Sequence, residues 1–132
     1  MSGITDLDEL LRSMRPKLIP TEFVFCTTSG ALRDYVSLEP VATFIESEGL
    51  TLVLEKSRAE EAGLAFEGIY QQITLTVHSS LDAVGLTAAV ASKLASKGIS
   101  ANVIAAYYHD HIFVQQDKAT PALLALEEFS AE

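Results

Sequence analysis

The sequence predicts an α+β fold in which antiparallel strands alternate with short amphipathic helices. Residues 73–78 alternate between apolar and polar side chains, which is the period of a half-buried strand. Residues 84–97 carry apolar side chains four residues apart, on one face of a helix. A pair of strands followed by a helix is expected at residues 41–63 and again at 102–129, which indicates an internal repeat.

The first element expected is a short amphipathic helix. Thr5 and Asp8 predict its N-terminal cap, and Pro16 predicts its end near Arg15. Its apolar residues follow the spacing i, i+3, i+4, i+7, and they are Leu7, Leu10, Leu11 and Met14. The apolar run 23–26 then predicts a strand.

The middle of the chain predicts a hairpin and a helix. Residues 31–40 have no regular period. Residues 41–46 and 50–55 read as two strands joined by a turn that contains a glycine. Ser57 and Glu60 are spaced as a capping box, so a short helix is expected to begin there and to end near Gly63.

The second half has the clearest order of elements. The strand at 73–78 leads to the helix at 84–97, and Gly98 stands where a helix commonly ends. Residues 99–108 and 112–114 read as two strands separated by a tight polar break. The last helix is expected near Asp117 or Thr120, with Pro121 in its first turn, where a missing N–H does no harm.

The repeat is incomplete in each half. The second copy reads β-α-β-β-α and lacks a closing strand, whereas the first lacks an opening strand. We therefore expect two intertwined ferredoxin-like copies that lend each other strands, each with an antiparallel sheet and its helices on one face. The expected subdomains are residues 1–68 and 69–132. An uncovered sheet face or edge would be covered by the partner copy or by a second chain, so a homodimer is expected.

Composition excludes several classes of partner. The chain has 132 residues, of which 48% are hydrophobic, and 9 basic against 18 acidic residues give a net charge of −9. Nucleic acid and anionic membrane surfaces are poor partners for such a chain, because both attract cationic groups. The single cysteine, Cys26, excludes an intrachain disulfide and a cysteine-based zinc site. With no basic signal segment and no apolar run of about 20 residues, a cytoplasmic protein is expected.

Four short motifs resemble the ACT domain family. They are Ile73-Thr-Leu-Thr-Val-His-Ser-Ser, Val84-Gly85-Leu86, Gly98-Ile99-Ser100 and Tyr107-Tyr108-His109-Asp110-His111-Ile112. The chain resembles compact bacterial proteins with tandem ACT-like domains, related to the ACT units of amino-acid sensors. The likeness includes Phe25-Cys26 and the segment 37–40 in the N-terminal half. This resemblance implies a β-α-β-β-α-β fold and a regulatory or sensor role, with a small amino acid bound between ACT units.

The resemblance also implies a ligand site made of two loops. Its candidate residues are Ser79, Ser80, Val84, Gly85, Leu86, Tyr108, His109, Asp110 and His111. Backbone N–H groups of the first loop would receive the ligand carboxylate, and Asp110 would receive its ammonium. Two simpler interpretations stand beside this one. Gly85 would only permit a tight entry into the helix, and Asp110 would only bond its own backbone in a hairpin turn.

Two other functions remain open from the sequence. The chain would serve as a structural or protein-interaction module without a ligand, or His78, His109 and His111 would hold a metal ion in an enzyme. No motif of a hydrolase, a phosphate-binding loop or a zinc protease is present. Cys26 lies in an apolar run and is expected in the core. The expectation is therefore a non-enzymatic protein without a cofactor or a metal.

Overall fold

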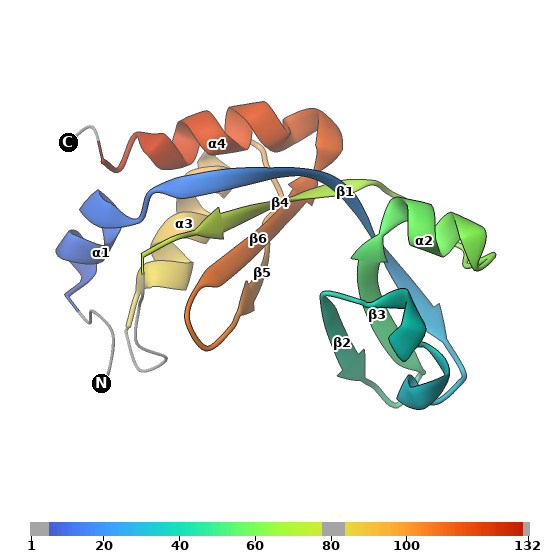
Figure 1. Cartoon of the computed structure of the whole chain (residues 1–132). Helices are drawn as coiled ribbons and strands as arrows, with labels where there is room; N and C mark the ends of the chain where they lie inside the picture. Colours follow the sequence, from blue (N-terminus) through green and yellow to red (C-terminus); the bar gives the residue numbers. More distant parts are fainter. Residues whose placement is uncertain (1–5, 78–83, 131–132) are drawn as a thin grey trace. The chain divides into compact units, whose positions relative to one another are not determined.

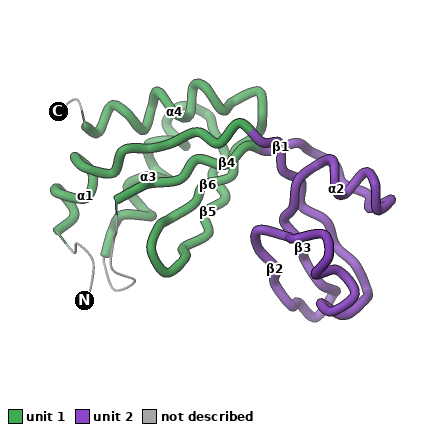
Figure 2. The backbone as a smooth tube through the Cα atoms, in the orientation of Figure 1, with its two compact units in different colours: residues 1–20, 71–132 green, residues 21–70 purple. Residues whose placement is uncertain are grey.

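The computed structural model describes residues 6–77 and 84–130 (Figure 1). The chain divides into two compact units (Figure 2). Unit 1 contains residues 1–20 and 71–132, and unit 2 contains residues 21–70. Because the first twenty residues group with the C-terminal segment, the compact units are not simply the two halves of the sequence.

The helices and strands follow each other in the order that the sequence predicts. They are α1 (Leu7–Ser13), β1 (Pro16–Thr28), β2 (Ala42–Ile45), β3 (Leu50–Glu55), α2 (Lys56–Glu61), β4 (Tyr70–Leu75), α3 (Leu86–Ser96), β5 (Asn102–Ala105), β6 (Asp110–Gln115) and α4 (Ala119–Glu127). Three short 3-10 turns are η1 (Leu32–Asp34), η2 (Val36–Leu38) and η3 (Gln116–Lys118). Hydrogen-bonded strands follow the order β2-β3-β1-β4-β6-β5, and the predicted α+β fold is confirmed.

Unit 1 is a complete ferredoxin-like unit whose closing strand comes from the other end of the chain. Its strand order is β1-β4-β6-β5, in which β4 is the first strand and residues 16–20 of β1 take the place of the last. Gln71 Nε2 donates to Ile19 O at 3.3 Å, and Thr76 N donates to Met14 O at 3.0 Å. The prediction that the second copy takes its closing strand from the N-terminal part of the chain is therefore confirmed.

One hydrophobic core holds unit 1 together. Helices α1, α3 and α4 share it with β4 and β6, so the helices cover one face of the sheet. The fully buried side chains include Leu10, Met14, Ile73, Leu75, Leu94, Ile112 and Leu126. Gly98 adopts φ 73° directly after α3, as expected for a residue that ends a helix.

Unit 2 is a reduced version of the same arrangement. The remaining part of β1 pairs with β3, with Cys26 opposite Leu52, and β2 pairs with the other side of β3. The expectation that the first copy lacks an opening strand is therefore wrong, because β1 supplies it. The turns η1 and η2 stand where a first helix would be, within the stretch predicted to be irregular. The buried core residues are Val24, Cys26, Leu50, Leu52, Leu54 and Ala59.

Several predicted boundaries need correction. The cap of α1 is Asp6, whose Oδ1 accepts from Glu9 N at 3.0 Å, and Thr5 lies outside the described residues. The helix α2 begins at Lys56 and has no side-chain cap, so the predicted capping box is wrong. The strand β1 has 13 residues instead of four, and β5 ends at Ala105 instead of Tyr108.

Candidate functional site

The β5–β6 turn lies beside the residue at which the described part of β4 and its continuation ends. A hydrogen bond from Ala106 N to His109 O, at 3.0 Å, closes the turn between β5 and β6. His109 Nδ1 lies 3.3 Å from Val77 O, where the connection from β4 to α3 begins. Of that connection, Ser79 and Ser80 lie outside the described residues. The described part of the site is therefore its α3 end and the β5–β6 turn.

Gly85 makes the turn that starts α3. Its φ of 97° lies in the left-handed region, which costs a residue with a side chain about 1–2 kcal/mol. A Cβ at this position would lie 3.1 Å from Leu7 Cδ2, so the glycine also allows α1 to pack closely. Gly85 is the N-cap residue of α3 and has no side chain with which to cap the helix. The tight entry is thus a property of the structure.

The neighbours of Gly85 differ sharply in exposure. Val84 is 82% exposed, whereas Leu86 is 4% exposed and belongs to the core of unit 1. The side chain of Leu86 is therefore too buried to contact a ligand, and Leu86 could do so only through its backbone. The side chain of Val84 is exposed and could contact a ligand directly.

Asp110 is a strand residue and does not lie within the hairpin turn itself. It is the first residue of β6 and pairs with Ala105 of β5. Its exposed fraction is 9%, and alternation along β6 puts it on the same side as Ile112, the side that the helices cover. A carboxylate held this deep in the unit is positioned by the strand rather than by a flexible loop.

His111 points to the opposite face of the sheet. Its Nδ1 lies 3.0 Å from Thr74 Oγ1 and 3.2 Å from Gln72 Nε2, and Gln72 Nε2 donates to Thr74 Oγ1 at 2.8 Å. Burial lowers the pKa of His111, a charge on His109 lowers it further, and Asp110 partly offsets both. Asp110 and His111 therefore do not converge on one point, although they are adjacent in the chain.

The tyrosines beside this turn lie at the surface. Tyr107 and Tyr108 are 69% and 61% exposed, and their rings meet edge to face with centroids 4.9 Å apart. Tyr108 and His109 have ring centroids 6.4 Å apart. The two tyrosines thus form an accessible aromatic rim beside the β5–β6 turn.

The histidine metal site is not assembled in the described part of the chain. Within residues 6–77 and 84–130, no group of three or more His, Cys, Asp or Glu side chains is arranged to hold a metal ion. His78 lies outside those residues, and the nitrogens Nδ1 of His109 and His111 already face polar protein atoms.

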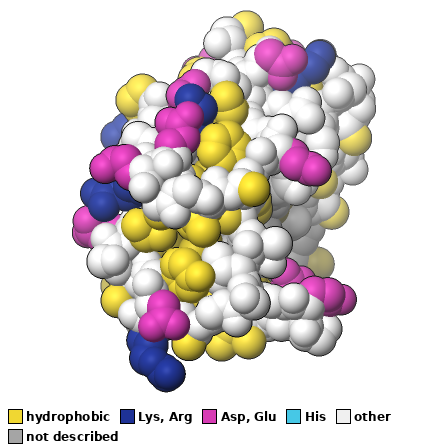
Figure 3. All heavy atoms as spheres, turned by 90° about the vertical axis from the view of Figure 1, so that its right-hand side faces the viewer, with side chains coloured by type: hydrophobic (Ala, Val, Ile, Leu, Met, Phe, Trp, Pro, Cys, Tyr) yellow, Lys and Arg dark blue, Asp and Glu magenta, His cyan; other side chains and the backbone are white. Residues whose placement is uncertain are grey.

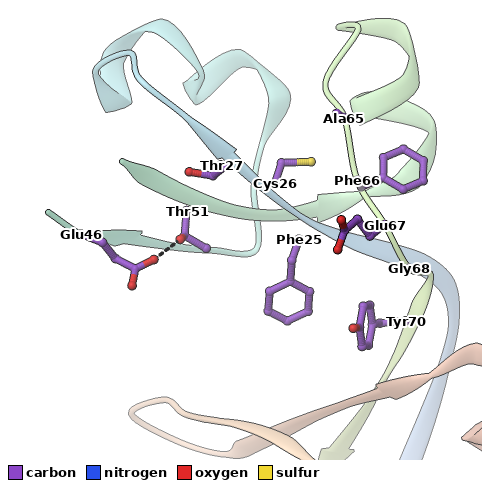
Figure 4. A pocket seen from close by; sticks show the side chains of 10 residues that line it. All are labelled: Phe25, Cys26, Thr27, Glu46, Thr51, Ala65, Phe66, Glu67, Gly68 and Tyr70. Carbon is purple, nitrogen blue, oxygen red and sulfur yellow. Dashed lines mark hydrogen bonds between the residues drawn. The ribbon is translucent and has the colours of Figure 1, made fainter. Parts of the chain in front are cut away.

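Sequence reasoning missed a cavity in unit 2 (Figure 4). Its volume is about 610 Å³, within the range of small-molecule sites. It is lined by Phe25, Cys26, Thr27, Glu46, Thr51, Ala65, Phe66, Glu67, Gly68 and Tyr70. These residues come from β1, β3, the β2–β3 turn, the segment that joins α2 to β4, and the first residue of β4. No local motif joins positions spread over 46 residues, so only the fold reveals them.

Cys26 contributes to the wall of this cavity but is itself buried. It is 3% exposed, and burial raises the pKa of its thiol. The prediction that Cys26 belongs to the core is therefore confirmed, and its thiol stays protonated at neutral pH.

Comparisons with known proteins give one consistent result. Two family models, each described as an ACT domain, match residues 2–71 and 67–128. A Vibrio cholerae protein of unknown function, termed a possible transport protein, is 64% identical with a TM-score of 0.88, over 98% of this chain and 99% of that one. The ligand-free regulatory subunit of aspartate kinase from Thermus thermophilus is 10% identical with a TM-score of 0.59, over 86% and 95% of the two chains.

A third similar structure is protein Atu0741 from Agrobacterium tumefaciens, which is 16% identical with a TM-score of 0.69 over 87% of each chain. At these low identities, the likeness of this protein and of the kinase subunit to the present chain shows a shared fold and nothing more. No curated protein matches the chain. None of the helices within residues 6–77 and 84–130 has the length and apolar character needed to span a membrane.

Proposed function

Because the chain belongs to the ACT domain family, a family of small-molecule regulatory modules, we propose that it binds a small amino acid and acts as a non-enzymatic sensor or regulatory subunit. The ligand lies at an interface between ACT units. We assign the two ACT-like repeats to residues 1–68 and 69–132, and the protein to the cytoplasm.

The contact between His109 and Val77 supports this proposal. At 3.3 Å, it holds the β5–β6 turn beside Val77, the last described residue before the connection to α3. The start of α3, whose N-cap residue Gly85 has no capping side chain, offers backbone N–H groups that favour an anion such as a carboxylate. Asp110, held at the start of β6, is the carboxylate that receives the ligand ammonium.

A homodimer is part of the proposal. Within the described residues, β2 and β5 stand at the two ends of the strand order and pair on one side only. Near β2, large side chains are exposed, and they include Val41, Phe44 and Ile45 at 52%, 70% and 79%. Hydrophobic side chains reach the surface among charged ones in Figure 3. Edge strands with exposed apolar residues favour association with another chain.

A thermal-shift screen of the full chain against the twenty amino acids tests the proposal. An amino acid present at one hundred times its Kd is expected to stabilise the chain by about 2.7 kcal/mol. Asp110→Asn is expected to abolish that shift. The matched control is Asp117→Asn, since Asp117 is an exposed residue of η3 outside the candidate loops, and it is expected to retain the shift.

Three outcomes contradict parts of this proposal. Without a shift from any amino acid, the binding function is lost and a protein-interaction module, favoured by the exposed side chains near β2, takes its place. A shift that survives in Asp110→Asn removes Asp110 from the site. A chain that sediments only as a monomer at tens of micromolar, on the order of ordinary weak association, excludes the homodimer.

A further inference from the structure

We propose that the cavity of unit 2 binds a small organic cation, an amine with an apolar body. This site lies wholly within residues 21–70, so it is separate from the amino-acid site of unit 1. The proposal depends on three features of the cavity: its apolar aromatic wall, its uncompensated negative charge and its hydroxyl groups.

Aromatic side chains form one wall of the cavity (Figure 4). The rings of Phe25 and Tyr70 meet edge to face, with centroids 5.1 Å apart and an angle of 70° between their planes. Gly68 leaves room for the tyrosine ring, since a Cβ there would lie 3.3 Å from Cε1 of Tyr70. Phe66 adds a third ring to the lining. Such a wall favours an apolar body, and the faces of the rings attract a cation.

Among the residues that the structure describes, the charged side chains that line the cavity are two glutamates, Glu46 and Glu67. Thr51 Oγ1 donates to Glu46 Oε1, which holds that carboxylate at the wall. Within the described residues, neither Glu46 nor Glu67 forms an ion pair with a lysine or an arginine. The cavity therefore carries negative charge that a bound cation would compensate.

The basic side chains of α2 do not neutralise these glutamates. Lys56 lies 3.9 Å from Glu22 and 3.5 Å from Glu60. Arg58 lies 3.2 Å from Glu39 and 3.7 Å from Glu55. Both cations are therefore engaged with carboxylates that do not line the cavity.

The same charge pattern excludes a free amino acid as the preferred ligand. Its carboxylate would enter a cavity whose lining, among the described residues, offers two glutamates and no lysine, arginine or histidine. The hydroxyls of Thr27, Thr51 and Tyr70 also line the cavity, and they suit the N–H groups of an amine as acceptors. An amine without a carboxylate is the class that fits both the charge and the aromatic wall.

A titration of the full chain with three matched probes tests this inference. The probes are 2-phenylethylamine, 2-phenylethanol and phenylacetate, which share a ring and a two-carbon or shorter arm but differ in charge. We expect the amine to shift the amide NMR signals of Phe25, Thr51 and Gly68 and to bind about tenfold more tightly than the alcohol, with no binding of the anion. Added salt is expected to weaken the amine only.

Variants then locate the charge that the amine recognises. The double variant Glu46→Gln with Glu67→Gln is expected to reduce the preference for the amine over the alcohol to about twofold or less. The control is Glu61→Gln, since Glu61 is an exposed glutamate of α2 that does not line the cavity, and it is expected to keep the preference. Dispersed amide spectra check that each variant is folded.

The result separates this site from the amino-acid site. Asp110→Asn is expected to leave amine binding unchanged, so either site is tested without the other. Equal binding of the three probes, or an unchanged preference in the double glutamine variant, overturns the proposal. So does the absence of any shift at millimolar amine.

Discussion

His111 binds a proton less readily in the folded chain than in the unfolded chain. Burial and the charge of His109 lower its pKa below the ordinary 6.5, and Asp110 only partly offsets them. Between pH 6.5 and the lower pKa of the folded state, His111 is therefore protonated to a greater extent in the unfolded chain than in the folded chain. In that window, the contribution of His111 makes the free energy of unfolding decrease, and above 6.5 its contribution is fully present.

We expect His111→Gln to weaken the dependence of stability on pH. Urea denaturation of the wild type and the variant at about pH 7.5 and about pH 5.5 measures the effect. The wild type should lose more stability between the two values than the variant does. An equal loss in both proteins means that other groups, and not His111, carry the pH dependence.

Gly49 is needed for a close approach of two backbone segments. A Cβ there would lie 2.7 Å from Thr28 O and 2.9 Å from Thr27 Oγ1. We expect Gly49→Ala to reduce the free energy of unfolding by about 2–3 kcal/mol, because the backbone must shift to admit the methyl group.

The control for Gly49 is Gly63→Ala, measured by the same urea denaturation. No atom lies within 4 Å of a Cβ built at Gly63, and only its left-handed φ of 72° opposes a side chain. Its expected cost is therefore smaller, about 1 kcal/mol. If Gly63→Ala costs more than Gly49→Ala, the close approach at Gly49 is not the limiting feature.

At the scale of elements, α1 stabilises unit 1 through one buried face. Leu10 is fully buried in the core that α1 shares with α3. We expect Leu10→Ala to reduce the free energy of unfolding by about 2–5 kcal/mol, because it leaves a cavity. Leu124→Ala is the matched control, since Leu124 is 58% exposed on α4, and a change within about 0.5 kcal/mol is expected. Similar losses in both variants, seen in urea denaturation, would mean that α1 does not anchor the unit.

Elements with a clear period were predictable, and elements set by distant partners were not. The helix α3 and the strand β4 were found from alternation and spacing, because each buries one face against its own unit. The length of β1 was missed, since Pro16 and Pro20 suggest breaks and the pairing partners of β1 lie far along the chain. The short β5 was overestimated because an apolar run continues past Ala105 into an exposed turn.

At the scale of the whole molecule, the shared strand predicts how fragments behave. A fragment of residues 71–132 lacks α1 and the part of β1 that closes the unit 1 sheet. We expect it to lack a stable fold alone and to gain one when a peptide of residues 1–20 is added, as measured by far-UV circular dichroism and amide dispersion. A fragment that is fully folded without the peptide contradicts the role of the shared strand.

The candidate sites, too, could be predicted from the sequence only in part. The two loops of the amino-acid site were predicted, but Asp110 lies outside the turn itself, since pairing with Ala105 extends β6 to include it. The unit 2 cavity was missed, because its glutamates lie far apart in the sequence. Glu46 lies in the β2–β3 turn and Glu67 in the segment before β4, and only the fold brings both to the cavity that Phe25 and Tyr70 also line.

The sequence by itself determined the α+β class, the order of elements and the need for a borrowed strand, because each depends on local periods and their repetition. Only the tertiary structure decided that β1 serves both units, that Asp110 and His111 point to opposite faces, and that unit 2 has an open cavity. The reason is physical. Strand register and cavity shape arise from contacts between residues far apart in the chain, and no local pattern records them.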